Sequence, residues 1–176
     1  MQHRNGKAKK GKHRRLNFGN IKLTSQLAEF LGVYVGDGCM SVKSNGKPIM
    51  EIAGSMEEAG WISHVADLLW KVFGKRMAPR PHSDVYSIQT SENGICRFLK
   101  EQAGFPVGKK SLTVRVPKIV IGTPNLEIYS SFLRGYFDAD GCLNFERRTY
   151  GKYADFKKTY HYYPRLLIAP SPKIWF

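Results

Sequence analysis

Apolar residues recur at three- and four-residue steps in two stretches of this chain, which is the spacing of one helical face. They are Leu27, Phe30, Leu31, Tyr34 and Val35 in the first stretch, and Leu126, Tyr129, Leu133, Tyr136 and Phe137 in the second. Thr24 can cap the first helix, and Thr123 followed by Pro124 suits the start of the second, because proline is tolerated at the first helical position. The pattern predicts two helices that end near Asp37 and Asp140.

Both predicted helices end in the same kind of sequence. Residues 30–39 read FLGVYVGDGC, and residues 132–142 read FLRGYFDADGC. Aligning the Asp-Gly-Cys ends pairs Gly32 with Gly135 and Gly36 with Ala139. Small residues four positions apart lie on one helical face and let two backbones approach closely. We therefore expect the helices to pack on each other through Gly32, Gly36, Gly135 and Ala139.

The acidic residues of the two motifs, Asp37 and Asp140, are 103 positions apart, which is too long a period for a solenoid and indicates two similar subdomains. If the helices lie side by side, their negative C-terminal poles meet where these two carboxylates lie. Such carboxylates repel unless they are protonated or bridged by a cation, and oxygen ligands suit magnesium. Asp138, about 200° round the helix from Asp140, should point away and be structural. The alternative is that Asp-Gly merely terminates each helix.

The segment after the first motif predicts a repeating order of elements. Two strands within residues 40–53 flank Asn45-Gly46, a strong hairpin signal. Ser55 and Glu58 form a capping box for a helix that ends at Gly74. A second hairpin is expected within residues 76–90, followed by a helix from Ser91 to Gly104. The order of helix, two strands, helix, two strands and helix predicts an α+β fold.

The second motif is followed by a shorter segment. Residues 143–148 and 164–168 look like two strands, but only 35 residues follow Gly141, whereas 85 separate Gly38 from Thr123. By the template of the first half, a helix, a hairpin and a closing helix are missing. We therefore expect four regions: a basic disordered arm (1–20), a first half (21–104), a linker (105–123) and an incomplete second half (124–176).

The formal net charge of +14 favours a polyanionic partner. Seven of the first fifteen residues are Lys or Arg, with no acidic residue among them, as in arms that contact nucleic acid. Basic residues also lie on the predicted strands and adjacent loops, where a twisted hairpin can enter the major groove. The candidates for DNA contact are Lys43, Lys47, Arg76, Arg80, Arg147, Arg148, Lys152 and Arg165. Gln89 and Asn144 are candidates for reading base edges.

The cysteines and the apolar stretches indicate where in the cell the protein is expected. The three cysteines are scattered and form neither a disulfide framework nor a zinc motif, which favours a reducing, cytoplasmic and nucleoid-associated location. No apolar stretch is long enough to span a membrane, because Glu29 interrupts the longest candidate.

Residues 30–38 and 133–141 resemble the paired signature motifs of the LAGLIDADG homing endonucleases, and the resemblance covers roughly residues 22–173. It implies two pseudo-symmetric αββαββ(α) halves that pack through the motif helices, with antiparallel sheets forming a saddle on double-stranded DNA. The expected activity is sequence-specific, metal-dependent cleavage of DNA by a monomer once the second half is complete.

The resemblance also implies roles for single residues. Asp37 and Asp140 would be catalytic and would bind Mg2+, or another divalent cation such as Mn2+, with the backbone at Gly36 and Ala139 bordering the metal. A basic residue, often lysine, is expected near this site. The sequence does not place it: Ser55 occupies the expected first-half position, and Lys173 falls beside the second.

Two other functions remain open from the sequence. The first is a binding module of the same fold that does not cut, either a DNA binder or a maturase that binds intron RNA. The second is a basic ribosome-associated factor in which the Asp-Gly pairs are only helix ends. An intein context is not favoured, because the chain has neither a starting cysteine nor a terminal His-Asn pair.

Overall fold

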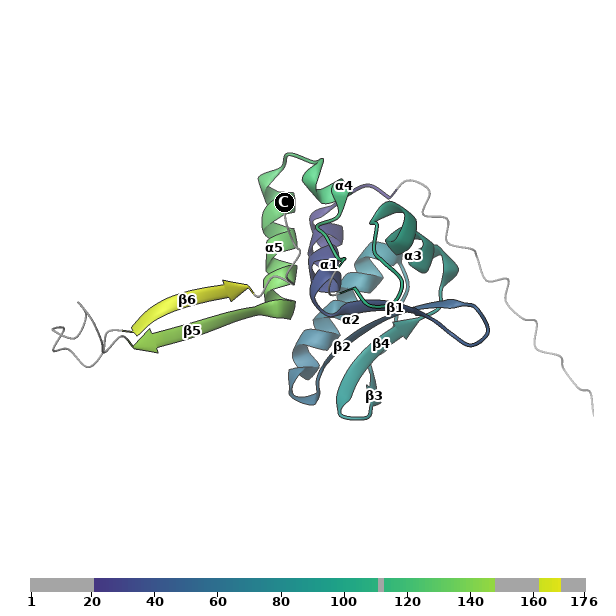
Figure 1. Cartoon of the computed structure of the whole chain (residues 1–176), viewed down its shortest axis with the longest axis horizontal. Helices are drawn as coiled ribbons and strands as arrows, with labels where there is room; N and C mark the ends of the chain where they lie inside the picture. The colour runs from purple at the N-terminus through teal and green to yellow at the C-terminus, as the bar shows by residue number, and fades with distance from the viewer. Residues whose placement is uncertain (1–20, 111–112, 148–161, 169–176) are drawn as a thin grey trace, which may run out of the picture.

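The computed structural model describes residues 21–110, 113–147 and 162–168 (Figure 1). The predicted basic arm, together with Arg148, Lys152 and Lys173, lies outside the described residues. Within the described part the chain has the mixed helix and antiparallel-sheet architecture that the sequence predicts, so the α+β fold class is confirmed. No helix in these ranges combines the length and apolar character needed to cross a bilayer.

The two motif helices lie side by side and run in the same direction at the centre of the molecule (Figure 1). They are α1 (Ser25–Gly36) and α5 (Leu126–Asp140). Thr24 caps α1 as predicted, because its side chain accepts a hydrogen bond from the Leu27 amide. The predicted cap of α5 is wrong. Asn125 caps this helix by accepting from the Glu127 and Ile128 amides, whereas the Thr123 hydroxyl donates to the Ile119 carbonyl.

The backbones of α1 and α5 touch at reciprocal glycines. A Cβ on Gly32 would lie 2.1 Å from the Phe132 carbonyl oxygen, and a Cβ on Gly135 would lie 2.1 Å from the Glu29 carbonyl oxygen. Phe132 occupies the same place in the second motif as Glu29 in the first, so the two contacts are related by a pseudo-twofold axis. No side chain fits at either position, which explains why glycine occupies a helix interior despite its low propensity.

A four-stranded antiparallel sheet follows α1, with the strand order β1-β2-β4-β3. The strands are β1 (Gly38–Val42), β2 (Pro48–Ser55), β3 (Arg80–His82) and β4 (Val85–Thr90). The predicted turn at Asn45-Gly46 joins β1 to β2, with Gly46 at φ +76°. One face of the sheet buries Met40, Met50, Ile52 and Ile88.

Helices cover that buried face. The predicted capping box at Ser55 and Glu58 is present and opens a short 3-10 helix, η1 (Met56–Glu58), which leads into α2 (Ala59–Phe73). Gly74 ends α2, as predicted, and adopts the left-handed conformation. The next helix begins at Asn93 rather than after Ser91: α3 (Asn93–Arg97) continues as a π-helix, η2 (Phe98–Gln102). The Thr90 hydroxyl accepts from the Glu92 amide and holds the chain before α3 in a turn.

The second half contains a separate two-stranded sheet, which projects away from the body (Figure 1). It pairs β5 (Gly141–Arg147) with β6 (Tyr162–Ile168) in antiparallel register. Between the halves, the predicted linker contains a short helix, α4 (Lys118–Ile121), which the sequence pattern does not predict.

Candidate active site

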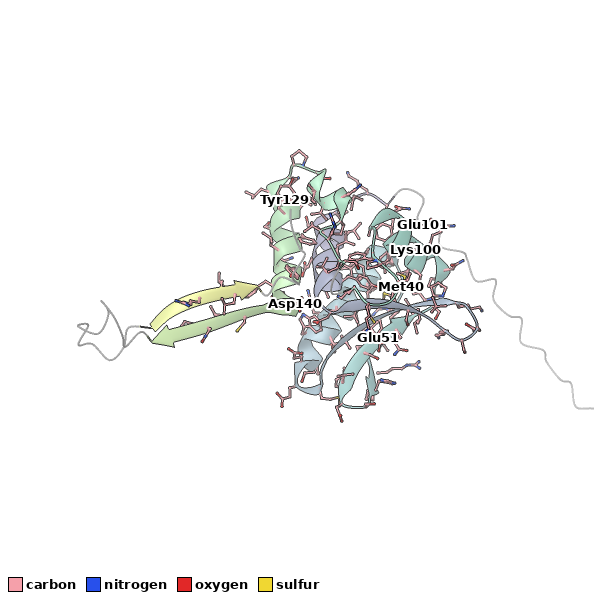
Figure 2. The ribbon with its side chains drawn as sticks, viewed as in Figure 1. Met40, Glu51, Lys100, Glu101, Tyr129 and Asp140 are labelled. Carbon is pink, nitrogen blue, oxygen red and sulfur yellow. The ribbon has the colours of Figure 1, made fainter. Side chains whose placement is uncertain are left out.

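The two motif aspartates meet at the C-terminal ends of the paired helices. Asp37 is the residue after α1, and its amide donates to the Val33 carbonyl. Asp140 is the last residue of α5, where β5 departs (Figure 2). The carboxyl carbon of Asp140 lies 3.4 Å from the position that a Cβ would take on Gly36. The structure therefore brings the second carboxylate against the end of the first helix.

The glycine after each aspartate is required by packing. A Cβ on Gly38 would lie 2.2 Å from the Tyr34 ring, and a Cβ on Gly141 would lie 2.2 Å from the Phe137 ring. Neither glycine has a positive φ, so the alternative that these are ordinary left-handed helix caps does not describe them. Because each glycine leaves room for the neighbouring ring, β1 begins directly after α1 and β5 directly after α5. Asp37 and Asp140 therefore lie at the two helix-to-strand junctions.

The packing of small residues continues up to the site. A Cβ on Gly36 would lie 2.5 Å from the Cβ of Ala139, so one of the two positions has room for a side-chain carbon and the other does not. Asp138 is exposed on α5, and no hydrogen bond or ion pair of its side chain is found among the described residues.

A lysine from the predicted linker completes the site. Lys110 Nζ donates to the backbone carbonyls of Tyr34 at 3.0 Å, Val35 at 2.7 Å and Gly36. These are carbonyls of the last turn of α1, which carry the negative end of the helix dipole and lack partners within the helix. An ammonium group has three donors, and all three are used here. Lys110 therefore places a fixed positive charge beside both aspartates.

The loop that carries Lys110 is packed rather than a plain surface linker. The Phe105 ring is buried and meets the Tyr34 ring edge-on, with centroids 4.7 Å apart. The Gly108 amide donates to the Met40 carbonyl at 2.7 Å, with Gly108 at φ +95°, where a side chain is strained. These two contacts attach the loop to α1 and β1, so that Lys110 reaches the end of α1.

Burial and neighbouring charges shift the pKa values of the groups in the site. Burial raises the pKa of Asp37 to about 6, with repulsion from Asp140 adding to the effect and Lys110 opposing it. Burial lowers the pKa of Lys110 to about 8, against the attraction of Asp140 and Asp37. Burial also raises the pKa of the Cys39 thiol, as does the Glu51 carboxylate, while Lys110 opposes both. Glu51 and Lys110 thus both lie within electrostatic reach of Cys39.

The donor set suits a hard divalent cation. The described residues contain no group of three or more His, Cys, Asp or Glu side chains that could enclose a metal. A site of two carboxylates still matches magnesium, which retains waters and combines one or two carboxylates with substrate phosphates. The raised pKa of Asp37 agrees with this, because burial and, to a lesser extent, repulsion from Asp140 disfavour its charged form, and a bound cation would offset both effects.

Several predicted DNA-binding residues gather on the first sheet. Lys43, Arg76 and Arg80 line a hollow of about 500 Å³, together with Gln89. The guanidinium of Arg76 stacks on Trp70, 4.1 Å from the ring centroid. Lys47 is exposed at the β1–β2 turn and is not among the residues lining the hollow.

The remaining predicted contacts lie on the second sheet. Arg147 ends β5, and Arg165 is exposed on β6 opposite Asn144. The structure thus distributes the predicted basic residues over two sheets on either side of the aspartates.

Sequence reasoning missed two basic residues near these surfaces. Lys75 also lines the hollow and pairs with Glu92 at 2.7 Å. Lys110 was assigned to the linker, and the clue available was the Gly108-Lys109-Lys110 run itself. Ser55, the position expected for a basic residue, instead accepts from the Glu57 amide as a helix cap.

A buried acid joins three helices away from the site. Glu29 on α1 accepts from His64 Nε2 on α2 at 2.8 Å and from Arg134 on α5. Burial by itself raises the pKa of Glu29, but hydrogen bonds from Arg134 and His64 outweigh it and hold the pKa below the usual value. This cluster fixes the helix pair against the first half.

Comparison with known proteins gives partial matches, and no family model matches the chain. A probable translation initiation factor IF-2 of Methanocaldococcus jannaschii is 28% identical over 131 residues, which make up 70% of this chain and 10% of that protein. The corresponding protein of Thermococcus kodakarensis is 31% identical, over 65% of this chain and 9% of its own. A replication factor C small subunit of Methanocaldococcus jannaschii is 29% identical, over 81% of this chain and 8% of its own. The chain thus spans about a tenth of the length of these relatives.

Solved structures are similar over a larger share of their length. A mesophilic variant of the homing endonuclease I-DmoI matches at a TM-score of 0.48 and 14% identity, covering 67% of this chain and 59% of that one. The LAGLIDADG meganuclease I-AabMI bound to uncleaved DNA matches at a TM-score of 0.46 and 14% identity, covering 82% of this chain and 65% of that one.

Proposed function

We propose that this chain is a sequence-specific endonuclease of the LAGLIDADG kind, which hydrolyses phosphodiester bonds of double-stranded DNA with a divalent cation. The observation that carries the proposal is the meeting of Asp37, Asp140 and Lys110, which come from three separate segments, at one end of a pseudo-twofold helix pair. Structural requirements alone do not explain two carboxylates held together at the negative poles of two helices.

The chain's own residues divide the work. Asp37 and Asp140 would hold the cation, which supplies an activated water and stabilises charge on the departing oxygen. Lys110 adds a fixed positive charge near the developing negative charge, and its three carbonyl bonds keep it in place without reorganisation. The reciprocal glycine contacts hold the two aspartates at a constant separation.

The basic residues would bring DNA to the site. Lys43, Arg76 and Arg80 on the first sheet and Arg165 on the second lie on strands or adjacent loops, where they can contact phosphates. Such contacts supply affinity and register, while the strand residues between them face base edges.

The relatives support a function that is separate from their names. They are named for initiation of translation and for replication, and each matches over about a tenth of its length. The similarity therefore follows a segment rather than either named process, as expected for a mobile coding element such as a homing endonuclease.

The proposal is tested by cleavage after selection of a target. Duplexes that bind the full chain are enriched from a randomised library in calcium, inserted into a plasmid and incubated with magnesium. The parent should cut both strands, while Asp37→Asn and Asp140→Asn should bind the same duplex equally well or slightly better and fail to make the double-strand cut. Asp138→Asn is the matched control, because this neighbouring carboxylate is exposed and should leave cleavage unchanged.

The pattern of cutting distinguishes a site in which each aspartate serves one DNA strand from a site in which both aspartates share one cation. If each aspartate serves one strand, each single variant should still nick; if one cation is shared, either change should abolish both cuts. Variants that cut both strands at the parental rate would refute the assignment. A parent that binds a specific duplex but never cuts would favour the DNA-binding module instead.

A further inference from the structure

A carboxylate stands in the middle of the basic sheet face. Glu51 on β2 lies opposite Cys39 on β1 and Gln89 on β4, so the three residues form one row across the sheet. The neighbouring residues Met50 and Ile52 are buried on the other face, and the alternation of a strand therefore places Glu51 on the open one (Figure 2). Gln89 in the same row lines the basic hollow.

The side chain of Gln89 orients the Glu51 carboxylate through a hydrogen bond. Gln89 Nε2 donates one hydrogen bond to Glu51 Oε1 at 2.8 Å and its other to the Ser87 hydroxyl oxygen at 3.5 Å, so both amide N–H groups are used. Because an ionised carboxylate only accepts hydrogen bonds, the amide nitrogen of Gln89 must face it. The groups left for a ligand are then acceptors: the second carboxylate oxygen of Glu51 and the amide oxygen of Gln89.

The described residues provide no cation that neutralises this carboxylate. Within the described ranges no lysine, arginine or histidine lies within ion-pair distance of Glu51. An unpaired negative charge on a surface that binds a polyanion weakens every complex unless it accepts a hydrogen bond from the ligand. In the major groove the available donors are the amino groups of cytosine and adenine.

The two acceptors together discriminate between those bases. Adenine presents an N7 acceptor beside its amino group, and guanine and thymine present acceptors at the corresponding edge. Cytosine presents its N4 amino group without an acceptor beside it. We propose that Glu51 is a specificity-determining residue that selects cytosine in the major groove, with Gln89 as its positioning residue. This inference rests on the proposed function, because it assumes that the sheet lies on duplex DNA.

The row also fixes where the selected base lies. Cys39 follows Asp37 by two residues, strand residues advance about 3.3 Å each, and facing residues on paired strands lie about 5 Å apart. The backbone of Glu51 therefore lies within about 10 Å of the backbone of Asp37. At about 3.4 Å per base-pair step, this distance corresponds to about three base pairs. The selected cytosine lies within about three base pairs of the cut.

The test compares sequence profiles of the full chain without cleavage. Parent, Glu51→Gln, Gln89→Ala and the control Glu101→Gln are each used to enrich duplexes from one randomised library in calcium. Glu101 is an exposed glutamate in η2, well apart from Glu51 in Figure 2. The parent and Glu101→Gln should show the same C·G pair near the cut. Glu51→Gln should lose that preference about five- to tenfold and keep every other position, and Gln89→Ala should lose part of it.

A change in the DNA rather than in the protein guards against a variant that folds poorly. Changing the selected C·G pair to T·A should weaken parental binding about five- to tenfold, and the same change should weaken binding by Glu51→Gln less than twofold. A Glu51→Gln profile identical to the parent at every position would overturn the inference while leaving the endonuclease proposal intact. A parent that enriches no sequence would overturn both.

Discussion

The hairpins of the two halves have the same register and different surroundings. Gly38, Met40 and Val42 face Ile52, Met50 and Pro48 in the first half, and Gly141, Leu143 and Phe145 face Ile168, Leu166 and Pro164 in the second. Met40 is 2% exposed, whereas its counterpart Leu143 is 51% exposed. The difference lies in α2 and the elements after it, which cover the first sheet and have no counterpart among the described residues of the second half.

The motif helices show the same contrast. Phe30 of α1 is fully buried, packing edge-on against Phe73 of α2 with ring centroids 5.3 Å apart. Its counterpart Leu133 on α5 is 48% exposed. Local pattern therefore determines pairing and register, while burial depends on elements far along the chain.

The first prediction concerns Lys110, the cation that the predicted linker places beside the end of α1. Lys110→Met should lower the cleavage rate about 10²–10³-fold, because a preorganised charge beside the reacting phosphate is lost. DNA binding should change little. Lys109→Met is the matched control, since Lys109 is exposed next to it and should cut at the parental rate. Equal rates for both variants, measured by single-turnover cleavage, would show that Lys110 does not contribute to cleavage.

The second prediction concerns equivalent apolar residues on the two sheets. Met40→Ala should lower the free energy of unfolding by about 2–5 kcal/mol, because it leaves a cavity in the buried core. Leu143→Ala should change it by less than about 0.5 kcal/mol, since that side chain is half-exposed. Chemical denaturation of each variant measures both values. A similar loss at the two positions would show that the second sheet is covered in solution.

The third prediction concerns the contact that the halves share. Gly32→Ala and Gly135→Ala should each lower the free energy of unfolding by about 1–3 kcal/mol, because the added methyl group meets a backbone carbonyl. Gly60→Ala within α2 meets no atom within 4 Å and should stabilise the protein by about 0.5–1 kcal/mol. If all three changes stabilise, then α1 and α5 do not pack as described.

The fourth prediction separates the two aspartates by pH in the presence of a chelator. The folded-state pKa of Asp37 is about 6 against an ordinary 3.8, so its ionisation opposes folding. The favourable contribution of neutral Asp37 is complete below about pH 4 and is lost as the pH rises through about 6. Asp37→Asn should therefore exceed the parent by about 1 kcal/mol at pH 7.5, after allowance for partial exposure of the carboxyl, and match it near pH 4.

Thermal unfolding at the two pH values measures this difference, and Asp140→Asn provides the comparison. Removing Asp140 takes away a repulsion that raises the pKa of Asp37, so the transition in that variant should move to lower pH. A constant gap between Asp37→Asn and the parent at both pH values would contradict the assignment.

Much of the central structure could be predicted from the sequence, because its signals are local. Apolar spacing and the paired small residues predicted α1, α5 and their packing, and Asn45-Gly46 predicted the β1–β2 turn. The start of α5 was misplaced, because both Thr123 and Asn125 can cap and only the chain path decides. The pattern does not predict the pairing of β4 with β2, since it joins residues separated by thirty to forty positions.

The position of Lys110 could not be predicted for the same reason. It depends on the Phe105 contact with Tyr34 and on the hydrogen bond from Gly108 to Met40, and each joins residues about seventy positions apart. A run of two lysines in a linker is typical of a solvated surface. Only the folded loop reveals that Lys110 turns toward the end of α1.

The buried Glu29 determines which helix α1 can pair with. The reciprocal glycine contacts would be the same if two copies of α1 paired with each other, so they do not distinguish α5 from a second α1. Glu29 does, because Arg134 lies at the place where α1 has Leu31. In a pair of α1 helices each Glu29 would lose its arginine and remain a buried charge with only His64, at a cost of about 3–5 kcal/mol for breaking such a pair. This one carboxylate therefore disfavours self-association through α1 and favours the union of two different halves.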